Sequence, residues 1–146
     1  MIEEGEEFSI FLIEDREEDI DITREALKEA DRDCELEVVK EGETALSKLK
    51  ERSRKKSESF PDIILLDLNL PKMDGRKVLQ ELKEDDKLSP IPVIVLTVSK
   101  RDEDIAKSYD SGAAGYITKP IDFSEFVKTI NVVNKYWSIN ELPGRN

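Results

Sequence analysis

Polar side chains that could take part in chemistry lie at or just after the ends of four apolar runs of this sequence, where strands would end. They are Glu14 and Asp15, then Asp67 and Asn69, then Thr97, then Lys119. Three clustered carboxylates repel one another, so one of them stays protonated unless cations are nearby. A lysine supplies one positive charge, and Mg²⁺ prefers oxygen ligands such as these. Together these residue types suit phosphoryl transfer, in which cations neutralise the phosphoryl oxygens while a carboxylate attacks.

Each of these features has an ordinary structural explanation when it is taken alone. An acid pair after a strand is often a helix cap or a partner of the helix dipole. An acid at a strand end can cap a loop, and Lys-Pro is a common turn sequence. The combination is more informative, because ligands in open α/β sheets bind outside the carboxyl ends of the strands.

Apolar runs and helical patterns alternate along the chain and predict the elements that position these residues. The runs are FSIFLI (8–13), LEVV (36–39), DIILLDL (62–68), PVIVLTV (92–98) and GYITK (115–119). Several are continuous, which is typical of strands buried on both faces of a parallel sheet. Repeated strand–helix units predict an α/β sandwich with a mostly parallel sheet.

The intervening segments carry apolar residues at helical spacing with charged opposite faces. The last helix has the clearest stripe, and Asp122 with Glu125 forms a capping-box pattern at its start. A segment from 104 to 111 is a weaker helix prediction. The predicted buried residues are Ile20, Thr23, Leu27, Ala30, Ala45, Leu46, Leu49, Val78, Leu79, Leu82, Phe123, Phe126, Val127, Ile130, Val133 and Trp137.

Bulk composition narrows the classes of function. The 146 residues favour one domain over 1–146, with a core at about 8–138 and short tails. A net charge of −11 disfavours nucleic-acid binding. The absence of histidine excludes a Ser-His-Asp triad and a histidine-ligated metal site made by one chain. An acidic N-terminus, one cysteine and no long apolar run predict a cytoplasmic protein without a membrane span.

The sequence resembles the receiver domains of response regulators, the CheY-like family of two-component signalling. The matching stretches are FLIEDREED, EGETALSKL, PDIILLDLNLPKMDG, IPVIVLT and SGAAGYITKP, and they span nearly the whole chain in order. The resemblance implies a flavodoxin-like doubly wound sandwich: a five-stranded parallel sheet in the order 2-1-3-4-5, with five helices. The LPKMDGR loop, the SYDSGAAGYITKP run and a terminal YW are also similar to single-domain regulators that partner phytochrome-type histidine kinases.

The resemblance also implies roles for individual residues. Asp67 matches the phosphoacceptor, and Lys119 matches the lysine that contacts the phosphoryl group. Thr97 and Tyr116 match the switch pair, and the peptide between Lys119 and Pro120 is expected to be cis. The metal site, for Mg²⁺ or another divalent cation such as Mn²⁺, is matched by Glu14, Asp15, Asp67 and the backbone carbonyl of Asn69.

The expected function is a single-domain response regulator that accepts phosphate from a sensor histidine kinase or a histidine phosphotransfer protein. It would assist its own phosphorylation and dephosphorylation only, and would signal to a downstream protein target. A second copy is a candidate partner, through the fourth helix, fifth strand and last helix or a C-terminal patch of Val132, Tyr136 and Ile139. A receiver-like scaffold without phosphorylation and a phosphatase are alternatives. The phosphatase is disfavoured because Asn69 replaces the second acid that such enzymes commonly carry.

Overall fold

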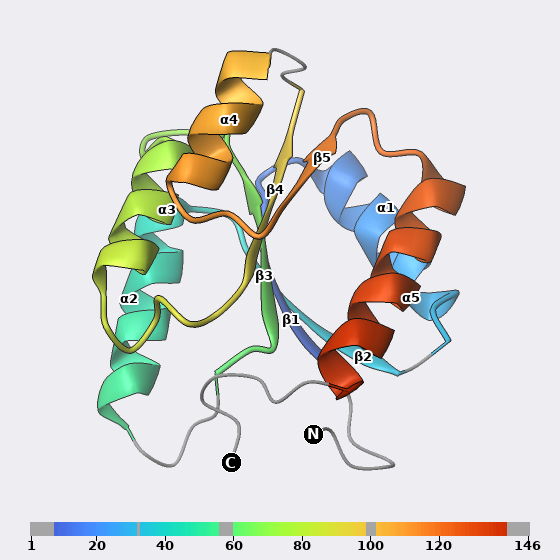
Figure 1. The fold of residues 1–146 in the computed structure, drawn as a ribbon, viewed down its shortest axis with the longest axis horizontal. Helices are drawn as coiled ribbons and strands as arrows, with labels where there is room; N and C mark the ends of the chain where they lie inside the picture. The colour runs from blue at the N-terminus through green and yellow to red at the C-terminus, as the bar shows by residue number, and fades with distance from the viewer. Residues whose placement is uncertain (1–7, 32, 56–59, 99–101, 140–146) are drawn as a thin grey trace.

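A computed structural model describes residues 8–31, 33–55, 60–98 and 102–139, without the side chains of 102–104 and 136–139. Strands and helices alternate along the chain (Figure 1). Their bounds are β1 Phe8–Ile13, α1 Glu17–Lys28, β2 Cys34–Val39, α2 Gly42–Arg54, β3 Ile63–Asp67, α3 Gly75–Glu84, β4 Val93–Thr97, α4 Asp102–Asp110, β5 Gly115–Thr118 and α5 Phe123–Ile139.

The five strands form one parallel sheet in the order β2-β1-β3-β4-β5, as the resemblance implies. Helices α1 and α5 cover one face of the sheet, and α2, α3 and α4 lie on the other (Figure 1). All strands run in the same direction, so their carboxyl ends meet at one edge. The order reverses between β1 and β3, which is the switch point where such sheets bind ligands.

Two hydrophobic cores lie between the sheet and the helices on its two faces. Residues alternate between them along each strand, because successive side chains point to opposite faces. Leu65 and Leu96 belong to the core under α1 and α5, whereas Leu66 and Val95 belong to the core under α2 and α3. Strands β3 and β4 are buried at every position, which explains their continuous apolar sequences.

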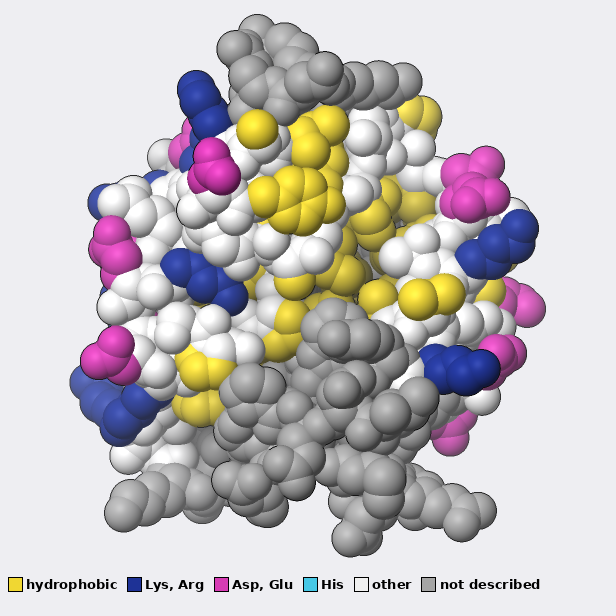
Figure 2. All heavy atoms as spheres, in the orientation of Figure 1, with side chains coloured by type: hydrophobic (Ala, Val, Ile, Leu, Met, Phe, Trp, Pro, Cys, Tyr) yellow, Lys and Arg dark blue, Asp and Glu magenta, His cyan; other side chains and the backbone are white. Residues whose placement is uncertain are grey.

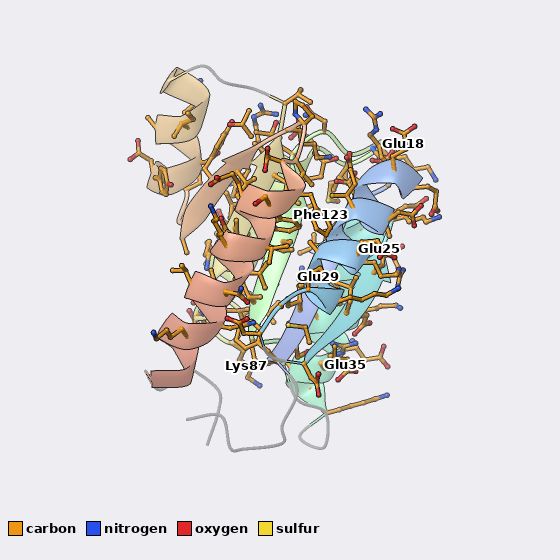
Figure 3. All side chains as sticks on the ribbon, turned by 90° about the vertical axis from the view of Figure 1, so that its right-hand side faces the viewer. Glu18, Glu25, Glu29, Glu35, Lys87 and Phe123 are labelled. Carbon is orange, nitrogen blue, oxygen red and sulfur yellow. The ribbon has the colours of Figure 1, made fainter. Side chains whose placement is uncertain are left out.

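The helical patterns predict the buried faces well, with one exception. Phe126 and Ile130 of α5 are buried, and Val133 is 7% exposed. Phe123 was expected in the same stripe, but this expectation is wrong, since the side chain is 44% exposed. It occupies the first position of α5, on the side towards α1 (Figure 3). The Trp137 side chain lies outside the described residues.

In the loop between β3 and α3, the positive φ belongs to Lys72, at 65°. Gly75 is needed for close approach: a Cβ there would lie 2.3 Å from the carbonyl oxygen of Asp67 and 2.5 Å from Cα of Leu68. The glycine thus lets α3 begin directly against the end of β3, with Asp74 as its N-cap.

Candidate functional site

The first part of the site is the end of β1. Glu14 directly follows the strand and is fully buried, and its Oε1 accepts a hydrogen bond from the backbone N–H of Arg16 at 3.2 Å. Asp15 is partly exposed, yet its Oδ1 atom is buried and no described group donates a hydrogen bond to it. A buried carboxylate oxygen without a partner is costly, which indicates that this position accommodates a further group.

Asp67 and Lys119 meet across the sheet at the same edge. Asp67 ends β3 with 1% of its surface exposed, and its Oδ1 accepts from the backbone N–H of Asn69 at 3.0 Å. The Nζ of Lys119, just beyond β5, lies 3.3 Å from Asp67 Oδ2 and donates to Glu14 Oε2 at 2.6 Å. The peptide bond between Lys119 and Pro120 is cis, as expected. Three strand ends thus bring these charged groups together.

Asp19 also reaches this site, although the sequence analysis did not select it. It lies in the first turn of α1, and its Oδ2 accepts a hydrogen bond from Lys119 Nζ at 2.8 Å. The first turn of α1 contains three acids, so the sequence alone would not have selected this one.

Thr97 completes the site from the end of β4. Its side chain is fully buried, and its Oγ1 accepts a hydrogen bond from Asn69 Nδ2 at 3.1 Å. The β4–β5 register pairs Val95 with Tyr116 and Thr97 with Thr118, so Thr97 and Tyr116 occupy the same face of the sheet. Tyr116 is half-buried against the core under α2 and α3.

The electrostatics of the site follow from burial and proximity. Burial raises the pKa of Glu14 from 4.5 to about 7, although the hydrogen bond from Lys119 opposes this rise. Burial would lower the pKa of Lys119, but its hydrogen bonds to Asp19 and Glu14 outweigh this effect and raise it. The lysine therefore stays protonated within a net negative site.

The acidic residues of this edge fit a divalent cation. Glu14, Asp15 and Asp67 each place one carboxylate oxygen within 4.8 Å of the others. These are hard oxygen donors of the kind that Mg²⁺ and Mn²⁺ prefer. The orphaned Oδ1 of Asp15 is a ready ligand. That the backbone carbonyl of Asn69 is a further metal ligand remains a prediction. The hydrogen bond from the Asn69 side chain to Thr97 was not predicted from the sequence.

The geometry defines a receiver-type α/β domain, and comparison with known proteins agrees. The model of the response regulator receiver domain family matches residues 10–131. The chain therefore belongs to this family, and it is the receiver domain of a response regulator in two-component signalling.

Particular relatives cover most of the chain. The response regulator Rcp1 of Synechocystis sp. is 37% identical over 128 residues, covering 88% of this chain and 87% of Rcp1. The solved structure of the phosphorylated cyanobacterial phytochrome response regulator RcpA has a TM-score of 0.79 at 40% identity, covering 94% of this chain and 99% of that one. The solved structure of the Mn²⁺-bound form of Rcp1 has a TM-score of 0.76 at 36% identity, and the match covers 92% of this chain and 98% of that one.

No helix among the described residues is long and apolar enough to cross a membrane.

Proposed function

We propose that Asp67 accepts a phosphoryl group from a phosphohistidine of a partner protein. A carboxylate oxygen of Asp67 attacks phosphorus, the phosphorus–nitrogen bond breaks, and the imidazole leaves. The observation that carries the proposal is the position of Lys119, whose ammonium lies 3.3 Å from Asp67 Oδ2 at the carboxyl edge of the sheet. A bound divalent cation would neutralise charge on the phosphoryl oxygens. Glu14, Asp15, Asp67 and the Asn69 carbonyl would hold it.

The chain's own residues divide the remaining work. Lys119 would pair with a phosphoryl oxygen and oppose its negative charge. Thr97 would exchange its hydrogen bond with Asn69 for one to the phosphoryl group. Tyr116, on the same face of the sheet, would then follow Thr97. This pair forms the two-state element whose populations phosphorylation shifts.

The phosphate donor must be another molecule, because the chain contains no histidine. A sensor histidine kinase or a histidine phosphotransfer protein is the proposed donor. RcpA is named as a phytochrome response regulator, and its likeness to this chain supports a phytochrome-type kinase as the partner. We also infer one receiver domain over residues 1–146, a cytoplasmic location, no catalytic turnover beyond the aspartyl phosphate, and a protein target downstream.

Intact-mass measurement tests the acceptor role. Incubation with acetyl phosphate and Mg²⁺ is expected to add one phosphoryl mass to the wild type and none to Asp67→Asn. Asp86 is an exposed acid in the loop before β4. The Asp86→Asn variant is the control and should take up phosphate normally. No adduct from any donor, candidate kinases included, would instead favour a binding scaffold. Rapid hydrolysis of phosphate esters would favour a phosphatase.

Self-association through the last helix is a further proposal about partners. Hydrophobic side chains gather on the face between α4 and α5 (Figure 2). Val132 on α5 is 67% exposed and Tyr109 on α4 is 48% exposed, whereas the side chains of Tyr136 and Ile139 lie outside the described residues. We expect beryllofluoride, a phosphoryl mimic, to increase dimer formation in analytical ultracentrifugation. A monomer with and without beryllofluoride would contradict this proposal.

A further inference from the structure

Asp19 is a half-buried acid that contacts the site from a helix rather than from a strand end. Its side chain is 13% exposed, and Lys119 Nζ lies 2.8 Å from its Oδ2. The carboxylate oxygens that cluster within 4.8 Å of one another come from Glu14, Asp15 and Asp67, and Asp19 stands outside this set. It is therefore a partner of the lysine and not a member of the metal-binding group.

The ammonium of Lys119 has three N–H groups and three carboxylates around it. The distances from Nζ are 2.6 Å to Glu14, 2.8 Å to Asp19 and 3.3 Å to Asp67. Two of these acids also belong to the set that fits a divalent cation. A cation there would compete for their charge and repel the ammonium, because like charges in a poorly solvated site interact strongly. Asp19 is the neighbour of the lysine that lies outside the cation-binding set.

Asp19 is itself held firmly. Its backbone carbonyl accepts a hydrogen bond from Thr23 Oγ1 at 2.8 Å, and Arg16 Nε lies 3.7 Å from its Oδ2. Asp19 lies in the first turn of α1, at the positive end of the helix dipole. The carboxylate thus has a fixed position beside Lys119.

We propose that Asp19 is a positioning residue, which holds the Lys119 ammonium beside Asp67 when a divalent cation occupies the acidic cluster. The inference rests on the proposed function for its effect on phosphorylation. Without Asp19 the cation would displace the ammonium, and the phosphoryl oxygens would lose their protein cation. Asp19 acts through Lys119 and contacts no reacting atom.

The rate of phosphate uptake at saturating Mg²⁺ and acetyl phosphate is the first measurement. Asp19→Asn is expected to slow uptake about tenfold, the effect of losing a hydrogen bond between charged groups. Asp19→Glu should restore part of the rate. Glu18→Gln is the matched control in the same turn, since its side chain is 85% exposed and points away from the sheet (Figure 3). It should match the wild type.

The second measurement follows the lysine directly, without phosphate. In ¹⁵N spectra of the ammonium groups, Lys119 should give a signal protected from exchange, assigned by its loss in Lys119→Met. With Mg²⁺ this signal is expected to persist in the wild type and in Glu18→Gln, and to disappear in Asp19→Asn. Thermal unfolding of each variant verifies that it is folded.

The outcomes separate this inference from the proposed function. Normal uptake by Asp19→Asn would overturn the positioning role and leave the phosphoacceptor intact. Slow uptake with an unchanged ammonium signal would also overturn it, because Asp19 would then act only on structure. If the wild type takes no phosphate, the proposed function fails, and the ammonium signal in Mg²⁺ still decides whether Asp19 positions the lysine.

Discussion

Val98 is an exposed apolar residue directly beside the site's buried groups. It follows the fully buried Thr97, and 59% of its surface is exposed. A branched side chain next to Thr97 would narrow the approach to Asp67 for small donors and for water.

We therefore expect Val98→Ala to gain phosphate from acetyl phosphate faster than the wild type and to lose it faster. Each rate is expected to change several-fold, because the substitution removes only two methyl groups beside the site. Intact mass followed over time gives both rates. Asp86→Asn, the exposed control position in the loop before β4, should change neither rate. Equal rates for Val98→Ala and the wild type would contradict the gating role.

The start of α3 shows how an element fixes the geometry of the site. Gly75 N–H donates to the carbonyl oxygen of Leu68 at 3.0 Å, and Asp74 caps the helix through the N–H of Arg76. These contacts bind the helix to the chain just beyond Asp67. A side chain at position 75 would have to displace backbone, which cannot give way as a flexible side chain can.

We expect Gly75→Ala to lower the free energy of unfolding by more than about 2 kcal/mol, because its Cβ would overlap the backbone of β3. Gly112→Ala is the matched control. Gly112 has a φ of 102°, and an added Cβ would meet the flexible Lys83 side chain at 2.9 Å. Its cost should be about 1 kcal/mol. Urea unfolding measures both, and equal losses would refute the backbone-contact explanation for Gly75.

At the scale of the whole molecule, the acidic site makes stability depend on pH. Burial raises the pKa of Glu14 in the folded protein from its ordinary value of 4.5 to about 7. The stabilisation from the Glu14 proton is complete below pH 4.5 and is lost as the pH rises through 7. Above that range the metal-free fold carries one more buried negative charge.

In the presence of a chelator, the free energy of unfolding of the wild type should therefore fall by about 3 kcal/mol more than that of Glu14→Gln as the pH rises from about 4.5 to about 8. Urea unfolding at several pH values across this range measures the difference in the free energy of unfolding between the two proteins. Carboxylates stabilised by ion pairs act at lower pH and are common to both proteins, so they cancel in the comparison. Parallel pH profiles for the two proteins would show that Glu14 does not hold a proton in this range.

The sequence was sufficient to predict the strand and helix pattern, because hydrophobic periodicity reports burial locally. FSIFLI matches β1 residue for residue, and the other strands differ from their runs by one or two residues at an end. The sheet order required the family resemblance. Glu14, Asp67, Thr97 and Lys119 could be selected because each ends or follows a strand, and the structure brings them to one edge.

Only the tertiary structure placed Asp19 beside Lys119, Asn69 beside Thr97, and Gly75 against the backbone of β3. Each contact depends on where a side chain or backbone atom of one element meets another. The first joins residues 100 positions apart. Local sequence determines which face of an element is buried, because burial is a property of that element. It does not determine which polar groups meet within the site, because those distances are set by how α1, α3 and the sheet pack together.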